Sequence, residues 1–449
     1  MHRTNSHQGE RPAQASPDAG RGWTPAQAED RLRSLELFGM RFGLDRMHRM
    51  MTALSSPERS YDTVHVLGTN GKSSTTRMTA AILREHGLRT GAYTSPHLRS
   101  YSERVQIDGR ELDPDAFAEA IARASWAADR VNRTLAEDDH VTQFELLTAA
   151  ALWQMARQEV QVAVIEAGLG GRYDATSVID APITVLTNVG LEHTRWLGPT
   201  ITDIAEEKLA VVAASGTLVL GQNLEPDALA VAERIAGERH AEIVRPLPEL
   251  TAGILLRAPG AFQRRNFALA AAAAGAYLDR AGMALSEPAL ARAGAATEMR
   301  GRLQQIADDP LTIVDGAHNP AAVAALIDSL PEVVGDGPLA LVLGVLEDKD
   351  AAAMLAALLP LCARAWFTAP PGPRALPPAA LQSHARQLGY EDVSCEPRPE
   401  RALEQAQRWA REHGGTVLAT GSVYLVGELL ADELPATWDS PAHGRSAAG

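Results

Sequence analysis

The segment Gly68 to Ser74, which reads Gly-Thr-Asn-Gly-Lys-Ser-Ser, has the residue types and spacing with the clearest chemistry in this chain. It follows a short apolar run and precedes a helical pattern over Thr75–His86. A strand, a glycine-rich turn and a helix start in that order direct several backbone N–H groups at one anion. Lys72 adds a charge that reaches the outer phosphates, and Ser73 or Ser74 adds a hydroxyl near a metal ion. The pattern predicts a loop that binds a nucleoside triphosphate; a turn that only caps a helix is the alternative.

Three further polar residues stand at the ends of apolar runs that are typical of buried strands. Ser95 follows one such run, Glu166 ends a second, and His193 follows a third. Mg²⁺ prefers hard oxygen ligands together with phosphates, so Ser95 and Glu166 could hold it beside the loop. Taken singly, Glu166 could equally be an ion-pair partner, and His193 could be a loop residue that only makes hydrogen bonds.

The elements that must position these residues alternate between strand and helix patterns. Strands are expected at 64–67, 90–94, 162–165, 183–188 and 217–220, and helices at 26–38, 75–86, 114–135, 142–158, 201–214 and 264–280. Such alternation predicts an α/β fold with a mostly parallel, doubly wound sheet. Ligands of such sheets bind at the carboxyl ends of the strands, where Ser95, Glu166 and His193 all fall.

A second alternation begins near residue 300. Strands are expected at 311–315, 339–343, 364–368, 391–395 and 416–420, and helices at 320–330, 350–359, 377–388, 399–413 and 422–431. This predicts a smaller, Rossmann-like α/β domain. We therefore expect a disordered extension over 1–22, an ATP-binding domain over 23–298, a C-terminal domain over 299–434 and a tail over 435–449.

Length and composition limit the classes of function. A chain of 449 residues predicts two or three domains, and 45% hydrophobic with 22% charged residues is typical of globular proteins. The net charge of −14 opposes a nucleic-acid or anionic-membrane surface as the main function. The sequence has no apolar run of membrane-spanning length and no signal-peptide pattern, so a cytoplasmic protein is expected. Cys362 and Cys395 have no metal-ligand spacing and are expected to be packing residues.

Further motifs follow the phosphate loop along the chain. They are Thr94–Leu98, Ile165–Thr176, Glu192–Gly198, Gln263–Asn266, Gly301–Arg302, Asp315–Pro320, Asp348–Asp350 and Thr420–Glu428. In this order they resemble the motifs of folylpolyglutamate synthases and dihydrofolate synthases, a branch of the Mur-ligase superfamily. The resemblance covers residues 24–432.

This resemblance implies an ATP-dependent ligase. A pterin-bearing carboxylate would attack the γ-phosphate and release ADP, and the amine of L-glutamate would then attack the acyl phosphate and expel phosphate. Two carboxylate-bearing anions and a triphosphate repel one another, so metal ions, Lys72 and the loop amides must neutralise and align them. The implied partners are ATP, L-glutamate and dihydropteroate or a reduced folate, and the implied state is a monomer.

The resemblance also implies roles for individual residues. Two Mg²⁺ ions are implied, the first held by Ser95 and Glu166 and the second by His193 and Lys208, with Lys208 carrying a carbamate. Without the resemblance, Lys208 would be predicted to be a solvated helix lysine, and His318 an ordinary contact near a helix start. The implied catalytic residues are Lys72, Lys208, His193 and His318, and the implied ATP contacts are Gly68, Thr69, Asn70, Gly71, Lys72, Ser73, Ser74, Asn266, Arg302 and Asp315.

For the pterin, the resemblance points to three short segments. Phe144 could stack on the flat ring, while Glu145 or Asp174 could accept its N–H groups; core packing is the alternative for Phe144. The implied contacts are Phe42, Gly43, Leu44, Asp45, Thr142, Gln143, Phe144, Glu145, Tyr173, Asp174 and Ala175.

The sequence departs from the family pattern at several positions. Ser73 replaces a glycine of the loop, Glu192 replaces an aspartate, and Leu209-Ala210 replaces Ala-Gly after the lysine. Arg41 stands where an acid is common, which weakens the expectation that dihydropteroate is used in the usual way. The rival hypotheses are a P-loop NTPase switch, a non-catalytic nucleotide-binding protein, and a Mur-type ligase for another carboxylate.

Overall fold

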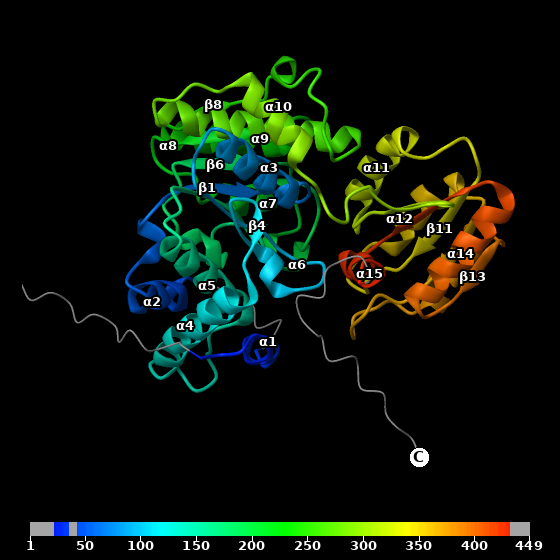
Figure 1. Ribbon diagram of the computed structural model, residues 1–449, viewed down its shortest axis with the longest axis horizontal. Helices are drawn as coiled ribbons and strands as arrows, with labels where there is room; N and C mark the ends of the chain where they lie inside the picture. Colours follow the sequence, from blue (N-terminus) through cyan, green and yellow to red (C-terminus); the bar gives the residue numbers. More distant parts are fainter. Residues whose placement is uncertain (1–21, 36–42, 432–449) are drawn as a thin grey trace, which may run out of the picture.

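The computed structural model describes residues 22–35 and 43–431, which form two lobes that lie side by side (Figure 1). Each lobe is a sheet with helices on its faces, and the first lobe, blue to green, contains the phosphate loop. The structure thus has the predicted α/β class, with one mostly parallel sheet in each lobe.

The first sheet has the strand order β4-β3-β2-β5-β1-β6-β7-β8. Strands β2 and β5 to β8 run parallel to β1, whereas β3 and β4 form an antiparallel edge. Its strands are β1 (Asp62–Leu67), β2 (Thr90–Tyr93), β3 (Val105–Ile107), β4 (Arg110–Glu111), β5 (Val162–Glu166), β6 (Ile183–Leu186), β7 (Thr217–Leu220) and β8 (Glu242–Val244).

The second sheet has the order β13-β12-β11-β14-β10-β9 and is parallel except for its edge strand β9. Its strands are β9 (Gln304–Asp308), β10 (Leu311–Val314), β11 (Leu339–Leu343), β12 (Arg364–Phe367), β13 (Val393–Cys395) and β14 (Thr416–Thr420). The parallel strands lie within the predicted ranges. The edge strand β9 was not predicted, because its residues are mostly polar and only partly buried.

The predicted helices are present, with shifts at their ends. The first begins as predicted at the Thr24 cap with a proline at its first position, and it ends at Arg33 rather than Phe38, which lies outside the described residues. The first-lobe helices are α1 (Pro25–Arg33), α2 (Asp45–Ala53), α3 (Lys72–Glu85), α4 (Pro114–Asn132), α5 (Gln143–Arg157), α6 (Thr194–Leu197), α7 (Ile201–Leu209), α8 (Pro226–Arg239), α9 (Ala261–Arg280) and α10 (Glu287–Ala296).

The helices of the second lobe keep the predicted positions. They are α11 (Pro320–Ser329), α12 (Ala351–Leu358), α13 (Pro378–Gln387), α14 (Pro399–His413) and α15 (Val423–Leu429). Short 3₁₀ turns lie at Pro57–Arg59, Tyr101–Arg104, Ala175–Val178, Pro248–Leu250, Leu330–Glu332 and Leu359–Leu361. Helix α7 ends at Leu209, five residues earlier than predicted, and a later turn at Ser215, which has a positive φ of 55°, leads into β7.

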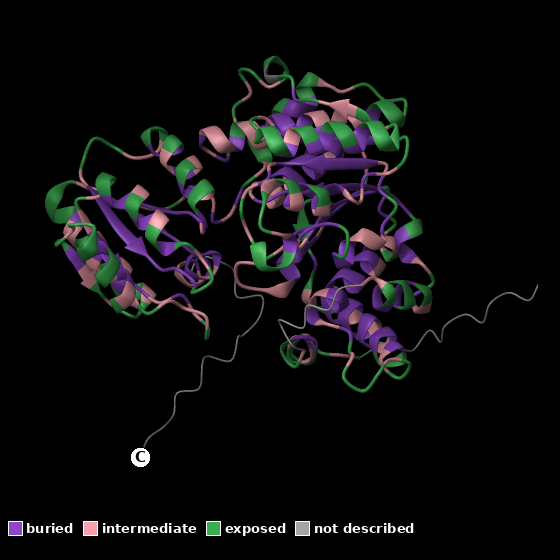
Figure 2. Ribbon diagram, turned by 180° about the vertical axis from the view of Figure 1, so that it is seen from behind, coloured by how far each residue is buried: buried purple, intermediate pink, exposed green. Residues whose placement is uncertain are grey.

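The central strands of the first sheet are buried on both faces (Figure 2). In β5, Val162 and Val164 pack toward α3 and α9, while Ala163 and Ile165 pack toward α4 and α5. This two-sided burial is why the strands read as continuous apolar runs. It also leaves the carboxyl ends of the strands as the place where polar groups can gather.

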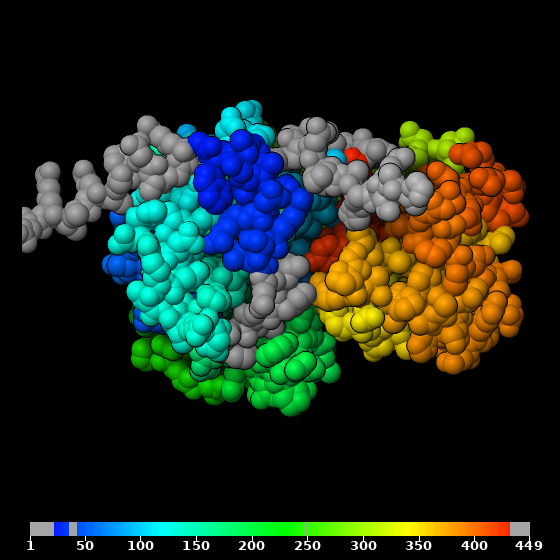
Figure 3. Space-filling model, turned by 90° about the horizontal axis from the view of Figure 1, so that it is seen from below, coloured from blue at the N-terminus to red at the C-terminus, as the bar shows by residue number. Residues whose placement is uncertain are grey.

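The two lobes touch along the carboxyl ends of their sheets. Figure 3 shows the red segment around α15 lying where the orange second lobe meets the first lobe. There, a Cβ built on Gly427 would lie 2.1 Å from the carbonyl oxygen of Leu98, so only glycine fits. Within the described residues, no helix combines the length and the apolarity needed to cross a membrane.

Candidate active site

The phosphate loop has a backbone that requires glycine at two positions. Gly68 has φ 147°, and a Cβ there would lie 1.8 Å from the hydroxyl oxygen of Thr187. Gly71 has φ 81°, and a Cβ there would lie 2.6 Å from the side-chain oxygen of Asn266. The loop follows the end of β1, as the sequence predicted, and α3 begins at Lys72, three residues before the predicted Thr75.

A buried carboxylate lies beside this loop. Glu166, at the end of β5, is 1% exposed. Its Oε1 accepts a hydrogen bond from the Ser73 hydroxyl at 3.0 Å, and its Oε2 accepts one from the Ser95 N–H at 3.0 Å. Burial raises the pKa of Glu166, although the charge of Lys72 opposes that shift. The structure thereby brings together the loop and the two predicted oxygen donors, which are hard ligands of the kind that Mg²⁺ prefers.

Lys208 is also buried at the loop and is not a solvated surface lysine. It is 4% exposed at the end of α7, and its Nζ donates to the carbonyl oxygen of Gly68 at 2.8 Å. Burial, with the nearby charge of Lys72, lowers the pKa of Lys208 to about 7. An ammonium cannot ligate a metal ion, so Lys208 and His193 fit a second ion only if the lysine gains an oxygen donor. In the described ranges, no three His, Cys, Asp or Glu side chains gather to hold a metal.

The sequence contains only three lysines, and all of them line this cavity of about 250 Å³. Lys72 and Lys208 come from the first lobe, and Lys349 comes from the second. Lys349 donates to Glu192 at 3.1 Å, while His193 and His318 lie 3.6 and 3.7 Å from the same oxygen. Although burial raises the pKa of Glu192, the nearby His318 and the charge of Lys349 hold that pKa well below its usual range. Glu192 therefore joins the lobes as a charged group.

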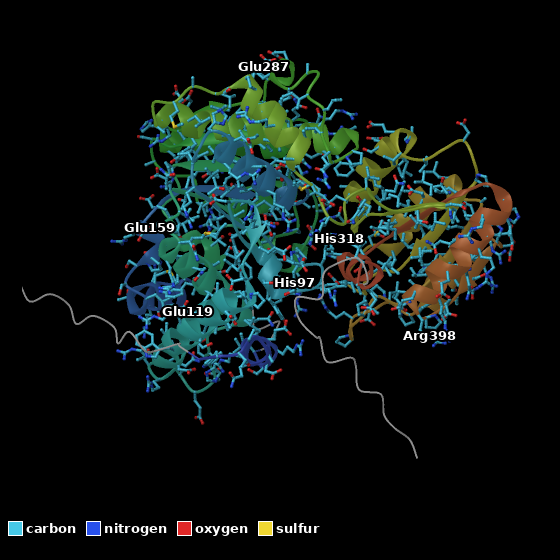
Figure 4. The ribbon with its side chains drawn as sticks, in the orientation of Figure 1. His97, Glu119, Glu159, Glu287, His318 and Arg398 are labelled. Atoms are coloured by element: carbon cyan, nitrogen blue, oxygen red, sulfur yellow. The ribbon has the colours of Figure 1, made fainter. Side chains whose placement is uncertain are left out.

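A second contact joins the loop itself to the C-terminal lobe. Asn70 donates to the Asn319 side-chain oxygen at 3.2 Å, and Asn319 donates back to Asn70 at 2.9 Å. Asn319 also caps α11, since its side chain accepts from the N–H of Ala322 at 2.8 Å. His318, beside it, lies at the junction of the lobes (Figure 4). The structure thus makes His318 part of the site rather than an isolated cap contact.

An adjoining cavity of about 300 Å³ holds the three remaining predicted ATP contacts. Asn266 lies on α9, Arg302 lies in the segment between the lobes, and Asp315 follows β10. Asp315 is 3% exposed and accepts from the N–H groups of Leu303 and Ala317 at 2.9 and 2.8 Å. The two cavities share Asn70, Gly71, Ser74, Arg302 and His318 in their linings.

Among the described residues, none of the predicted pterin contacts lines either of these cavities. Both oxygens of Glu145 accept from Arg46 Nε, at 3.0 and 3.2 Å, and Oε2 also accepts from the Thr142 N–H. Gln143 donates to the carbonyl oxygen of Leu32 and to Tyr101. The buried carboxylate of Glu145 already takes part in an ion pair and a helix cap, and its contact with a pterin stays a prediction.

Other residues predicted to contact the pterin are less buried than Glu145 or lie in turns. The partly buried Phe144 ring lies so close to Gly168 that a Cβ there would be 2.4 Å from its Cζ. Tyr173 is exposed, and Ala175 begins a 3₁₀ turn. Gly43 and Leu44 precede α2, which begins at Asp45. Phe42 and Arg41 lie outside the described residues.

Asp174 is held by a buried chain of hydrogen bonds that the sequence did not indicate. Its carboxylate accepts from the N–H of Leu169 at 2.7 Å and from the N–H and hydroxyl of Thr176. The Thr176 hydroxyl also lies 2.8 Å from Nε2 of His65, inside β1. Since the single hydroxyl proton goes to Asp174, Nε2 of His65 must carry the proton and donate. Burial lowers the pKa of His65 to about 4, so the ring is neutral at pH 7.

Sequence reasoning missed His65, Thr176 and Asn188 as parts of the site. Asn188, after β6, accepts from the N–H groups of Thr69 and Asn70 at 3.2 and 2.9 Å. The sequence did contain one signal for His65, because a polar residue stands there within an otherwise apolar strand. Asn319 and Lys349 were inside motifs that the sequence analysis quoted, but their partners lie in the other lobe.

Comparisons with known proteins agree with this arrangement. Residues 66–224 match the Mur ligase middle domain, and residues 301–423 match the Mur ligase, glutamate ligase domain. A relative named folylpolyglutamate synthase, from Lacticaseibacillus casei, is 35% identical over 361 residues, which are 75% of this chain and 84% of the relative.

Solved structures are similar over most of the chain. The Mycobacterium tuberculosis folylpolyglutamate synthase complexed with ADP has a TM-score of 0.84 and 31% identity, and the match covers 91% of this chain and 97% of that one. The E. coli FolC in complex with DHPP and ADP has a TM-score of 0.78 and 28% identity, with 91% and 97% covered.

Proposed function

Because the chain belongs to the folylpolyglutamate synthase/dihydrofolate synthase family of Mur ligases, we propose that it joins L-glutamate to a folate-type carboxylate at the expense of ATP. The observation that carries the proposal is one cavity, between the lobes, that is lined by the phosphate loop, Glu166 and all three lysines. A nucleotide switch would need only the first lobe's share of these groups.

The reaction follows from the charges of its substrates. The acceptor carboxylate oxygen attacks the γ-phosphorus and the bond to ADP breaks, which gives an acyl phosphate. The neutral amine of L-glutamate then attacks the acyl carbon, phosphate leaves with the bonding electrons, and the nitrogen loses a proton. Every reactant is an anion, so the rate depends on groups that hold the anions together in a site with little water.

The phosphate loop and Lys72 are proposed to hold the triphosphate. The Lys72 Nζ now donates to the carbonyl oxygen of Thr69 at 3.0 Å, so it is already folded back over the loop. Ser95 and Glu166 would hold Mg²⁺, which supplies charge neutralisation of the phosphates when bound. The Ser73 hydroxyl fixes the orientation of the Glu166 carboxylate. The family's glycine at this position would lack that hydrogen bond.

Lys208 is proposed to carry a carbamate. A lysine with a pKa of about 7 is largely the free amine at mildly alkaline pH, and only the free amine attacks CO₂. The new N–C bond forms as the nitrogen loses a proton, and a cation becomes a carboxylate anion. That change turns Lys208 into an oxygen donor, which with His193 would suit a second Mg²⁺ ion.

The second lobe is proposed to complete the site when it lies against the first. Asn266, Arg302 and Asp315 line the adjoining cavity, to which we assign the nucleoside part of ATP. His318 and Lys349 bring cationic or donor groups to the carboxylates of L-glutamate. We place the boundary between the ATP-binding and glutamate-ligase domains at residues 298 and 299, in the segment that joins α10 to β9.

The acceptor is proposed to be dihydropteroate, a reduced folate, or both. Phe144 and Tyr173 provide ring surfaces near the turn at Gly168. Asp174 could accept one hydrogen bond more than those from Leu169 and Thr176, because a carboxylate has about four lone-pair sites. Glu145 is less suited to this role, because both of its oxygens already face the Arg46 guanidinium.

The test is phosphate release from Mg-ATP with L-glutamate, using dihydropteroate and tetrahydrofolate as separate acceptors. We expect release to require both L-glutamate and an acceptor, with one glutamate added per phosphate released by mass spectrometry. Hydrolysis at the same rate without an acceptor would contradict the ligase proposal and favour the switch. Replacing L-glutamate by D-glutamate is the matched control, because its charges are identical and its α-amine is misplaced.

A further inference from the structure

A separate cavity of about 510 Å³ lies in the first lobe beside α3. It is lined by α3, by the β3–β4 edge, by α1 and by the segment 296–300 that follows α10. Within the part of the chain that the structure describes, it shares no lining residue with the two cavities of the active site. Its volume is within the range of sites for small organic ligands.

Six arginines and four glutamates line this cavity, which leaves an excess of positive charge. The arginines are of most interest here. They are Arg33, Arg77, Arg84, Arg99, Arg110 and Arg300. Most of them have protein partners: Arg33 pairs with Glu29 at 2.7 Å, Arg300 pairs with Glu111 at 3.3 Å, and Arg84 donates to the Asp108 carbonyl at 3.0 Å. Arg99 donates to the carbonyl of Ala431 in the second lobe at 2.8 Å.

Arg77 differs from these arginines. It is partly buried on α3, and its Nε is enclosed without a hydrogen-bond partner among the residues that the structure describes. The nearby carboxylates are committed elsewhere. Glu103 accepts from the N–H groups of residues 98–100, and Glu111 pairs with Arg300. An enclosed N–H group without a partner is costly, and Arg77 also lines the cavity, where an anion could compensate the charge of its guanidinium.

We propose that this cavity, the Arg77 cavity, binds a small organic anion through a carboxylate or phosphate group on the Arg77 guanidinium. A guanidinium presents a planar pair of donors that matches the two oxygens of either group. Arg110 at the exposed rim adds a second cation. Glu103 and Glu111 also face the cavity, so a ligand with a positive amine beside its carboxylate is accommodated as well.

The Arg77 cavity lies next to segments that lead to the phosphate loop and to the second lobe. Arg77 lies on the helix that begins at the phosphate loop, and Arg300 lies on the segment that leads into the second lobe. Arg99 already binds that lobe. A ligand on these three arginines would therefore contact both parts whose approach builds the active site.

The experiment measures binding by isothermal titration calorimetry in protein saturated with Mg-ADP, which fills the phosphate loop. Inorganic phosphate and tri-γ-glutamate are titrated as separate probes. We expect at least one probe to bind, and Arg77→Gln to weaken it at least about tenfold. The exposed Arg245→Gln is the matched control and should bind the same probe as wild type does. Binding of phosphate alone would identify a phosphate-type ligand, and binding of the peptide alone a carboxylate-type ligand.

A second variant covers the case in which Arg77→Gln does not fold. Glu111→Gln removes a negative charge and frees Arg300, so it should strengthen binding of the same probe several-fold. ADP affinity should be unchanged in every variant. Absence of binding by both probes in the wild type, or equal affinity in Arg77→Gln or Glu111→Gln and the wild type, would overturn the proposal.

Discussion

At the scale of single residues, the site depends on side chains whose charge is set by burial. Lys208 illustrates the point, because a surface lysine would stay protonated and unreactive toward CO₂ at pH 7. Burial and the charge of Lys72 lower its pKa to about 7. The same physical cause keeps His65 neutral inside its strand.

We predict that Lys208→Ala keeps ADP binding and loses ligation by at least about a hundredfold. The loop survives the change, but the proposed oxygen donor does not. Calorimetry with Mg-ADP and the coupled assay measure the two properties. Arg280→Ala, which removes an exposed cation of α9, is the control and should retain activity.

The carbamate itself has a direct readout. Because the chain has three lysines, ¹³C-labelled bicarbonate should give one carbamate signal in the NMR spectrum that disappears in Lys208→Ala. The signal should grow as the pH rises from 6 to 8, since a lowered pKa frees the amine over that range. A wild-type spectrum without a carbamate signal at pH 8 would refute the proposed modification.

His65 gives a prediction about stability. Its folded pKa of about 4 lies below its unfolded value of about 6.5, so the unfolded chain binds more protons between these values. The free energy of unfolding should therefore fall as the pH drops from 6.5 to 4, by up to about 1.4 kcal/mol per pH unit from this residue. In His65→Gln, which keeps a donor for Thr176, urea titrations should show a shallower fall. Parallel profiles for the two proteins would contradict this.

At the scale of elements, the turn between β1 and α3 leaves no space for a side chain at either of its two glycines. Gly68 has a positive φ and meets Thr187, and Gly71 has a positive φ and meets Asn266. Neighbouring strands and α9 thereby shape the loop from both sides.

We predict that Gly68→Ala abolishes measurable ADP binding and destabilises the protein by at least about 1–3 kcal/mol. Both effects have one cause, since the added Cβ forces the loop away from β6. Gly237→Ala on α8 is the control, because a Cβ there meets nothing within 4 Å. It should leave ADP binding unchanged and raise stability slightly in thermal unfolding. Normal ADP affinity in Gly68→Ala would show that the loop accommodates the added Cβ, which would contradict the prediction.

At the scale of the whole molecule, two polar contacts hold the lobes together beside the site. Asn70 and Asn319 exchange hydrogen bonds, and Lys349 meets Glu192. The departure at Glu192 from the family's aspartate lengthens the side chain that reaches Lys349 by one methylene. The lobe contact and the site are therefore made by the same residues.

We predict that Lys349→Met keeps ADP affinity within about threefold but lowers ligation strongly. Removing the cation leaves the partly buried Glu192 carboxylate uncompensated, at a cost of about 1–3 kcal/mol to the closed arrangement. Small-angle scattering should show a larger radius of gyration than for the wild type. Glu192→Gln combined with Lys349→Met should recover the compact form, because the uncompensated charge is gone. An unchanged radius of gyration in Lys349→Met would show that this ion pair does not hold the two lobes together.

Much of this protein follows from local sequence. The apolar runs predicted the parallel strands, because those strands are buried on both faces, and Gly68–Ser74 predicted the phosphate loop, because its chemistry lies within seven consecutive residues. The polar edge strand β9, the commitment of Glu145 to Arg46 and the chain from His65 to Asp174 could not be predicted in this way. Each depends on partners far apart in sequence, and only packing of the folded chain brings them within hydrogen-bonding distance. The same holds for the three lysines: the sequence shows that they are few, and the approach of the two lobes places them in one cavity.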